Sequence, residues 1–281
     1  MNFNKDPQVS VITVVLNDVV GLTKTIESVQ EQLGIRFEHV IVDGGSTDGS
    51  AVLAERNSDV KIESRPDGGI YQAMQRGLEV ASGEYVIFTN AGDALFGTNY
   101  LANAVDDLTS ADKSWGFGPL VEESLRGSIV WTPVSGEISL LRIAFRKTYV
   151  PFPTVVVSSD LVRGVGGFSQ SYSIAGDFDL IVRLSLQELP IRWDYPVARF
   201  AAGGISYTKA PLAWSEERQI RRNRLELSGL QITSDWLIGR KKLARWQAGK
   251  FLDALQNIGV LGNQHWRDRR ATEIPSKYLK L

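Results

Sequence analysis

The first hundred residues alternate between short, continuous apolar runs and segments whose apolar residues are spaced like those of a helix. The apolar runs cover residues 9–16, 39–42, 60–63 and 85–89. Helical spacing is found over residues 21–31, 50–56 and 70–80. Runs rich in β-branched residues predict strands buried on both faces. Their alternation with helices predicts a mostly parallel sheet that is covered by helices on both sides.

The pattern changes after Asp93. The elements expected there are a helix over residues 100–108, strands over 114–118, 128–131 and 153–158, and a helix within 174–186. This order describes a mixed, partly antiparallel half, and the chain beyond it is predicted to be helical. The predicted domains are an α/β domain over residues 1–210, with halves of about 1–97 and 98–210, and a helical appendage over 211–281.

Composition and charge exclude several classes of function. A net charge of −1 argues against nucleic-acid binding, which usually leaves a strongly basic signature. The chain has no cysteine, and its only histidines are His39 and His265, so a thiolate or histidine-rich metal site is not expected. Any metal would be a hard cation held by oxygen. A polar N-terminus and the lack of a long apolar run predict no signal peptide or transmembrane helix, and we expect a cytoplasmic protein.

Polar residues follow two of the predicted strands. One strand leads into Asn90-Ala91-Gly92-Asp93, and another leads into the segment 43–50, which begins at Asp43 and contains Asp48. The carboxyl ends of parallel strands are where α/β sheets bind their ligands. Asn, Gly and Asp are also ordinary turn residues, so capping of the next helix is the alternative role for Asp43 and Asp48. We expect Asp93 to lie on a surface turn.

Four segments resemble one enzyme family. Residues 11–17 and 42–50 look like the opening of glycosyltransferase family 2, residues 67–77 are similar to its next landmark, and residues 90–93 take the place of its Asp-x-Asp element. The resemblance covers about residues 9–207 and is strongest to the bacterial branch that builds capsule, exopolysaccharide and lipid-linked oligosaccharides. It implies the nucleotide-sugar-binding fold called GT-A.

The resemblance also implies a donor site. The positions that bind the nucleotide sugar fall here on Leu16, Asn17, Asp43, Arg65, Asp67, Asn90 and Ala91. Leu16, Asn17 and Asp43 would flank the nucleoside, and the carboxylate of Asp43 would accept a hydrogen bond from the base NH. Arg65 and Asp67 would contact the base or the sugar-phosphate.

A divalent cation is the cofactor that the resemblance implies. Asp93 would hold Mn²⁺ or Mg²⁺ against the diphosphate, where the cation stabilises the charge that develops on the leaving nucleotide. The chain has Asn90 and Gly92 where carboxylates are common in the family. Asn90 offers a carbonyl oxygen as a ligand instead.

Asp177 is the expected general base. In Gly176-Asp177-Phe178-Asp179 it matches the Glu-Asp position of the family, and a carboxylate there would take the proton of the acceptor hydroxyl. Gly176 stands where the family usually has Glu. Because an Asp ahead of a helix is also a common cap, capping is the alternative for Asp177. For Asp179 we favour a capping or structural role.

The C-terminal appendage carries two basic clusters with tryptophans between them. The clusters are Arg218, Arg221, Arg222 and Arg224, and Arg240, Lys241, Lys242 and Arg245. One helical face contains Leu237, Ala244, Ala248, Phe251 and Leu255. A basic amphipathic helix of this kind indicates contact with an anionic membrane surface, which would make the protein peripheral on the cytoplasmic membrane face. Packing of this face on the catalytic domain is the alternative, and the sequence does not decide between the two.

The sequence therefore predicts a metal-dependent, inverting glycosyltransferase. It would move one sugar from a nucleotide sugar, with UDP as the default nucleotide, to a carbohydrate or polyprenyl-linked acceptor. A nucleotidyltransferase is the rival enzyme, but residues 16–21 lack the glycine-rich, basic loop that usually marks one. A sugar-nucleotide-binding protein with weakened catalysis is the third alternative, suggested by Asn90, Gly92 and Gly176.

Overall fold

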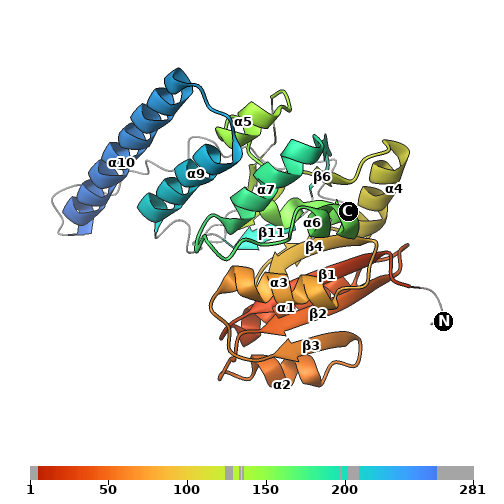
Figure 1. Ribbon diagram of the computed structural model, residues 1–281. Coiled ribbons are helices and arrows are strands. Elements are labelled where there is room, and N and C mark those ends of the chain that lie inside the picture. The colour runs from red at the N-terminus through yellow and green to blue at the C-terminus, as the bar shows by residue number, and fades with distance from the viewer. Residues whose placement is uncertain are drawn as a thin grey trace. The chain divides into compact units, whose positions relative to one another are not determined.

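The structure is a computed structural model (Figure 1). It describes residues 6–123, 129–132, 134, 136–196, 198–201 and 209–257. The chain divides into two compact units, whose described parts lie within residues 6–201 and residues 209–257. The first is called the α/β unit and the second the helical unit. The remainder of the predicted appendage, residues 258–281, lies outside the described residues.

A seven-stranded sheet forms the centre of the α/β unit, in the order β10-β6-β9-β4-β1-β2-β3. Its strands are β1 (Val9–Val15), β2 (Phe37–Asp43), β3 (Val60–Ser64), β4 (Tyr85–Asn90), β6 (Trp115–Phe117), β9 (Val156–Ser158) and β10 (Ile191–Arg192). Strands β1 to β4 are parallel, whereas β9 runs antiparallel to both of its neighbours. The mostly parallel sheet predicted from the alternating pattern is confirmed.

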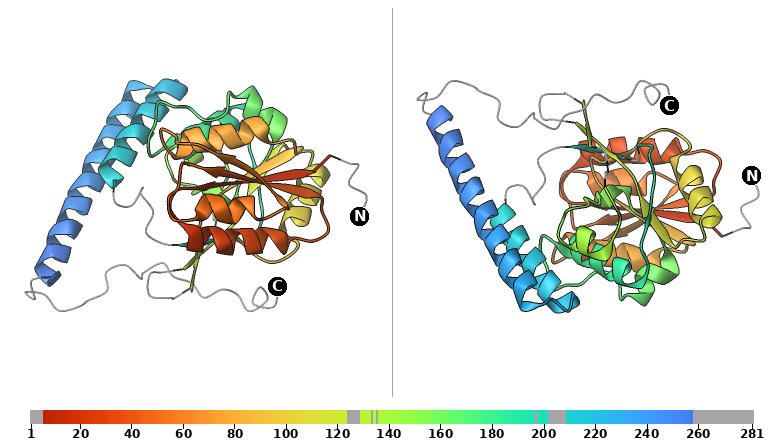
Figure 2. Two further views of the ribbon diagram at one scale, coloured as in Figure 1. Left: turned by 90° about the horizontal axis from the view of Figure 1, so that it is seen from below. Right: turned by 90° about the horizontal axis from the view of Figure 1, so that it is seen from above.

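Helices cover both faces of this sheet (Figure 2). They include α1 (Val19–Gln30), α2 (Ser50–Glu55), α3 (Ile70–Val80) and α4 (Tyr100–Ser110). Ile12 of β1 packs in one apolar cluster with Met74 of α3. Val15 packs in another cluster with Leu22 of α1 and Ala54 of α2. Since alternate residues of a strand point to opposite faces, the continuous apolar run of β1 fills the core on both sides.

The second half of the α/β unit is mixed, as expected. A second sheet has the order β5-β11-β7-β8, with β5 (Ala94–Leu95), β7 (Leu120–Glu123), β8 (Ile129–Thr132) and β11 (Ala198–Ala201). The remaining elements are α5 (Leu140–Ala144), the 3-10 turn η1 (Phe152–Thr154), α6 (Ser159–Gly164) and α7 (Gly176–Gln187). Helix α7 matters most here, because it carries Asp177.

The helical unit contains α9 (Ala210–Arg224) and α10 (Gly229–Asn257). The two helices are joined by a buried ion pair, in which Arg221 Nη2 lies 2.7 Å from Asp235 Oδ1. Among the helices of the described residues, none is both long enough and apolar enough to cross a membrane.

Candidate functional site

Four neighbouring strands end along one edge of the large sheet. Val15 of β1 is aligned with Asp43 of β2, and Asp43 is aligned with Ser64 of β3. On the other side of β1, Val14 is aligned with Asn90 of β4. The next residues along these strands are Leu16, Gly44, Arg65 and Ala91. The strand register therefore gathers the predicted donor-binding residues at one edge of the sheet.

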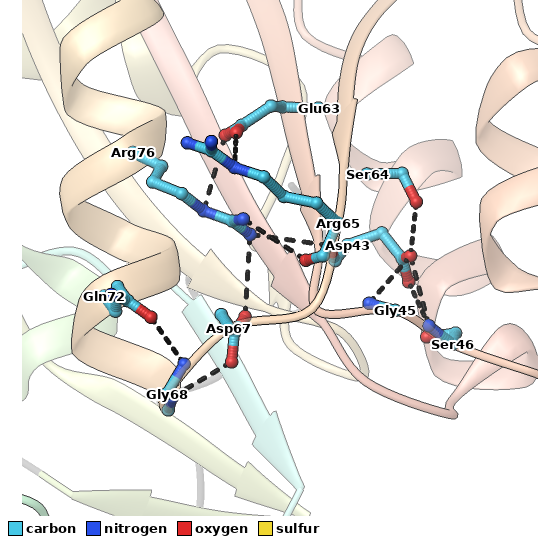
Figure 3. Close-up of polar contacts among 11 residues, drawn as sticks. Asp43, Gly45, Ser46, Glu63, Ser64, Arg65, Asp67, Gly68, Gln72 and Arg76 are labelled. Carbon is cyan, nitrogen blue, oxygen red and sulfur yellow. Dashed lines mark hydrogen bonds and ion pairs between the residues drawn. The ribbon is translucent and has the colours of Figure 1, made fainter.

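The carboxylate of Asp43 organises the loop that follows β2 (Figure 3). It accepts hydrogen bonds from the backbone N–H groups of Gly45 and Ser46, at 3.1 Å each, and from Ser64 Oγ at 2.7 Å. Burial alone would raise the pKa of Asp43, but the hydrogen bonds from Ser46 and Ser64 hold this pKa below its ordinary value. The residue is fully buried, so its carboxylate serves as an anionic anchor for the loop.

Arg76 of α3 holds the neighbouring strand ends together, and the sequence analysis gave it no role. Its guanidinium donates hydrogen bonds to the backbone oxygens of Arg65, at 3.2 Å, and of Asp43, at 3.5 Å (Figure 3). It also lies 3.5 Å from Glu63 Oε2 and 3.6 Å from Asp67 Oδ2. The side chain is buried, and its charge is paired with carboxylates from two sides. In the sequence, this role was signalled only by the position of Arg76 shortly after the acidic residues Glu63 and Asp67.

Arg65 and Asp67 lie on either side of this network. Arg65 is 64% exposed in its side chain and pairs with Glu63 Oε1 at 2.8 Å, so its guanidinium remains open to a ligand. The carboxylate of Asp67 accepts a hydrogen bond from the N–H of Gly69 at 3.0 Å and packs against Gly44. A Cβ atom at position 44 would lie 2.8 Å from Asp67 Oδ2, which explains why a glycine follows Asp43.

Leu16 and Asn17 form the border of the site after β1. Asn17 has a left-handed backbone with φ 53°, which Asn tolerates better than most residues. Its N–H donates to Ser46 Oγ and its Oδ1 accepts from the N–H of Thr47, both at 2.8 Å. Leu16 is 60% exposed. These contacts fix the loop after β1 against the loop after β2. The apolar side chain of Leu16 remains exposed beside them.

The carboxylate of Asp48 contacts the first residues of two helices, α1 and α2. Its carboxylate accepts hydrogen bonds from the N–H of Val19 at 2.8 Å and from the N–H and Oγ of Ser50, at 3.0 and 2.6 Å. The bond from Ser50 Oγ is the main reason that the pKa of Asp48 lies below its ordinary value. These contacts tie Asp48 to the first residues of α1 and α2, whose N-cap residues are Asp18 and Gly49.

The expectation that Asp93 lies on a surface turn is wrong. Asp93 is only 3% exposed, and its Oδ2 accepts hydrogen bonds from the backbone N–H and from Nδ2 of Asn90, at 3.1 Å each. The hydroxyl of Thr25 in α1 donates a hydrogen bond to the backbone oxygen of Asp93 at 2.6 Å, so that α1 covers this turn. Burial raises the pKa of Asp93 to about 7, although the bonds from Asn90 oppose the rise.

The oxygen atoms of this turn fit a hard cation that takes further ligands from a diphosphate. Among the described residues, no three carboxylate or imidazole groups gather into a site that would hold a cation alone. However, Asn90 Oδ1 is buried and accepts no hydrogen bond from the described residues. Mg²⁺ is commonly bound by one or two carboxylates together with substrate phosphates and water. Asp93 and Asn90 match that donor set.

Asp177 reaches the same region from the second half of the unit. It lies in the first turn of α7 and is partly exposed. The hydroxyl of Tyr71, in the first turn of α3, lies 3.2 Å from Asp177 Oδ1. Since α3 begins just after the Asp67 loop, this contact joins Asp177 to the edge where β1 to β4 end.

Asp179 has a different environment from Asp177, two residues away. It is fully buried, and its Oδ2 lies 2.7 Å from Arg183 Nε. Arg183 also donates to the backbone oxygens of Val165 and Gly167, at 2.6 Å each. This arrangement ties α7 to the end of α6 and gives Asp179 a structural partner.

A cleft of about 430 Å³ lies against α3. It is lined by Arg65, Pro66, Gln72, Gln75, Arg76, Glu79 and Gln170. Arg65 is the one predicted site residue in this lining. The cleft therefore meets the strand-end site at Arg65, while the other predicted residues lie outside its walls.

Comparison with known sequences identifies relatives across most of the chain. The family model described as "Glycosyl transferase family 2" matches residues 10–119. An uncharacterised glycosyltransferase of Mycobacterium tuberculosis is 32% identical over 247 residues, which cover 84% of this chain and 92% of that protein.

Two solved structures share the fold. TarS of S. aureus in complex with UDP has a TM-score of 0.63 at 19% identity, over 81% of this chain and 68% of that one. The mannosyltransferase PcManGT of Pyrobaculum calidifontis, in complex with GDP-Man and Mn²⁺, has a TM-score of 0.60 at 20% identity, over 93% of this chain and 77% of that one. The predicted GT-A architecture is confirmed.

Proposed function

The chain belongs to glycosyltransferase family 2, and we propose that it transfers one sugar, with inversion at the anomeric carbon, from a nucleotide sugar to a carbohydrate or polyprenyl-linked acceptor. UDP is the proposed nucleotide, since TarS, which shares the fold, was solved with UDP. The family assignment removes the basis for the nucleotidyltransferase alternative. A binding protein with weakened catalysis remains the competing hypothesis.

The observation that best supports this proposal is the contact between α3 and α7. Through Tyr71, it brings the carboxylate of Asp177 to the edge where four parallel strands present polar residues. In the proposed reaction, the acceptor oxygen forms a bond to the anomeric carbon while the bond from that carbon to the diphosphate oxygen breaks. The diphosphate leaves with the bonding electron pair, and the acceptor proton passes to Asp177. Attack opposite the leaving group inverts the anomeric configuration.

The donor would bind along the strand ends. Leu16 and Asn17 would border the nucleoside, since Leu16 exposes an apolar side chain beside the loop that Asp43 anchors. The exposed guanidinium of Arg65 suits a phosphate or a base oxygen. Asp67 and Ala91 complete the proposed donor edge.

Asp93 would hold the divalent cation, Mn²⁺ or Mg²⁺, with Asn90 Oδ1 as a further ligand. When bound, this cation would neutralise charge on the departing diphosphate. The chain itself contributes one carboxyl group and one amide oxygen at this turn. Most of the cation's remaining ligands would therefore come from the donor, which predicts tighter cation binding when the nucleotide is present.

The helical unit is proposed to contact an anionic membrane surface on the cytoplasmic side. Three of its acidic residues, Glu216, Glu217 and Asp235, are buried, and Arg221 pairs with two of them. The basic side chains of Arg240, Lys241 and Arg245 are exposed on α10. These three acids are therefore buried, whereas the three bases of α10 are exposed.

Large apolar side chains lie on the exposed surface of the same helix. Leu230 is 85% exposed and Leu237 is 56% exposed. The guanidinium carbon of Arg240 lies over the ring of Trp236, 5.0 Å from the ring centre. A tryptophan and leucines among exposed bases are typical of helices that lie in a lipid interface. Such a surface would hold the enzyme near a polyprenyl-linked acceptor.

Sedimentation with lipid vesicles tests the membrane contact. The full chain should sediment with vesicles containing phosphatidylglycerol, should do so less at high salt, and should not sediment with phosphatidylcholine vesicles. Leu237→Glu and Lys241→Gln should weaken binding. Lys24→Gln, which removes an exposed charge from α1, is the matched control and should bind as the wild type does. Equal binding to both kinds of vesicle, or none to either, would count against the proposed surface.

The transfer reaction itself is tested with a panel of nucleotide sugars. With Mn²⁺ or Mg²⁺ present, one donor should be hydrolysed slowly without acceptor and consumed faster with a suitable saccharide or polyprenyl-linked saccharide. NMR of the product should show the anomeric configuration opposite to that of the donor. Nucleotide-sugar binding with no turnover under any of these conditions would favour the weakened binding protein instead.

A further inference from the structure

The hydroxyl of Tyr71 contacts the start of helix α7 at two places. It lies 2.7 Å from the backbone oxygen of Ile174 and 3.2 Å from Oδ1 of Asp177. Tyr71 comes from α3, in the first half of the α/β unit, more than a hundred residues earlier in the chain. One buried phenol therefore connects the nucleotide-binding half to the backbone and the carboxylate at the first turn of α7.

The ring of Tyr71 is held firmly. It is buried in the main apolar cluster and stacks on Phe168, with ring centres 5.9 Å apart and planes 17° apart. Burial, and then the nearby charge of Asp177, raise the pKa of Tyr71 well above its ordinary value, so the hydroxyl keeps its proton. At neutral pH it is a hydrogen-bond donor and cannot itself act as a base.

Gly176 provides the space for this ring. A Cβ atom at position 176 would lie 2.6 Å from Cδ2 and 2.8 Å from Cε2 of Tyr71, closer than atoms of a packed ring can tolerate. This position is where the chain departs from the Glu that is usual in the family. Glycine at position 176 is therefore explained by Tyr71, since the Tyr71 ring occupies the place that a larger side chain would fill.

A general base must be held at the correct position to take a proton during attack. The carboxylate of Asp177 is partly exposed, and its Oδ1 also accepts a hydrogen bond from the N–H of Phe178 at 2.7 Å. The contact with Tyr71 adds to this bond and further limits the rotamers open to the side chain. A buried donor on a rigid ring limits that freedom more than a surface residue would. The hydroxyl of Tyr71 has a single proton, which is shared between the Ile174 carbonyl, at 2.7 Å, and the carboxylate of Asp177, at 3.2 Å. The phenol therefore holds the backbone that carries the base and also contacts the base.

We propose that Tyr71 is a positioning residue for Asp177, and that Gly176 is the small residue that lets it approach. This inference rests on the proposed function, in which Asp177 is the base. Tyr71 does not touch the reacting atoms in this role. It acts through the orientation of Asp177 and of the first turn of α7.

Tyr71→Phe is the decisive variant, because it keeps the ring and its packing and removes only the hydroxyl. We expect kcat to fall about tenfold, the equivalent of one lost hydrogen bond, with the KM of the nucleotide sugar unchanged. Tyr100→Phe is the matched control, since that buried hydroxyl donates to the backbone oxygen of Thr154 at 3.3 Å and has no described contact with Asp177. It should leave kcat as in the wild type.

The Asp177→Asn background separates this inference from the proposed function. If Asp177→Asn is slow, and Tyr71→Phe is slow by itself but has no further effect in the Asp177→Asn background, both hold. If Asp177→Asn is slow but Tyr71→Phe turns over as fast as the wild type, the positioning role is wrong and the base is retained. If Asp177→Asn is as fast as the wild type, the base assignment itself fails.

Gly176→Ala provides a second test that leaves the hydroxyl in place. The added methyl group must displace the Tyr71 ring or the start of α7, so kcat should fall at least as far as in Tyr71→Phe. Thermal unfolding should be followed in parallel. A Gly176→Ala enzyme that turns over like the wild type would show that the spacing between ring and helix is not required.

Discussion

Asp93 and Asn90 are joined twice, because the carboxylate of Asp93 accepts hydrogen bonds from both the backbone and the side-chain amide of Asn90, at 3.1 Å each. Asp93→Ala would leave these buried donors without an acceptor, at a cost of about 1–3 kcal/mol in the free energy of unfolding. The alanine variant is therefore a poor test of metal binding. This differs from the expectation for a residue on a surface turn.

Asp93→Asn separates folding from catalysis. The asparagine has nearly the same shape and keeps an acceptor oxygen, so the variant should fold, yet it loses the negative charge that would hold the cation. We expect transfer to fall at least about 100-fold. Steady-state transfer and urea unfolding of the asparagine variant check this, with chelator-treated wild type as the reference. Full transfer by the chelated enzyme would exclude the metal role.

Asp43→Ala should weaken donor binding and stability together. The alanine would release the N–H groups of Gly45 and Ser46, which shape the loop at the proposed nucleoside edge. We expect a higher Kd for the nucleotide sugar and a loss of about 1–3 kcal/mol in the free energy of unfolding. Titration calorimetry and urea unfolding measure the two effects.

Ser64→Ala is the graded control for that loop. It removes the 2.7 Å hydrogen bond from Ser64 Oγ and leaves the carboxylate of Asp43 with its backbone donors. The variant should lose less donor affinity than Asp43→Ala. If Asp43→Ala lowered kcat alone, with donor affinity intact, the nucleoside assignment would be wrong.

The sheet and its helices were predictable from the sequence because they depend on local periodicity. The apolar run over residues 9–16 became β1, and the helical spacing over residues 70–80 became α3 with the same bounds. Asp43 and Asn90 were placed at the same edge because parallel strands bring their carboxyl ends together. These predictions required no knowledge of distant contacts.

The parts of the site that depend on distant contacts were not predictable. Asn-Ala-Gly-Asp reads as an exposed turn, but the hydroxyl of Thr25, 68 residues away from Asp93, closes over it. The contact between Tyr71 and Asp177 spans 106 residues, and no spacing in the sequence marks it. Arg76 likewise gains its role only when Asp43, Asp67 and Glu63 meet around it.

His39 should make stability depend on pH. It is buried in β2, with Nε2 2.8 Å from Thr13 Oγ1, and burial lowers its pKa from 6.5 to about 4. Between these values the unfolded chain binds a proton that the folded chain does not. The free energy of unfolding therefore falls as the pH drops through this window, by about 1.4 kcal/mol per pH unit in its middle, and is unaffected by His39 above it.

His39→Gln isolates this contribution from that of the other titrating groups. The variant cannot take up the proton, so its stability deficit relative to the wild type should be greatest near neutral pH and should shrink toward the lower end of the window. Urea unfolding at several pH values measures the deficit. A deficit that is the same at every pH would show that His39 titrates normally in the folded state.

Asp177 and Asp179 should respond oppositely to the same substitution. Asp177→Asn removes the proposed base and should lower turnover by ~10²–10⁴-fold while leaving donor binding and stability near wild type. Asp179→Asn breaks a buried ion pair with Arg183, which should cost about 3–5 kcal/mol in the free energy of unfolding. Asp179 is fully buried against Arg183, so the folded fraction of its variant should retain most of its turnover. Turnover per folded molecule and urea unfolding, measured on both variants, check the pair. Turnover lost in Asp179→Asn but kept in Asp177→Asn would contradict the assignment of Asp177 as the base.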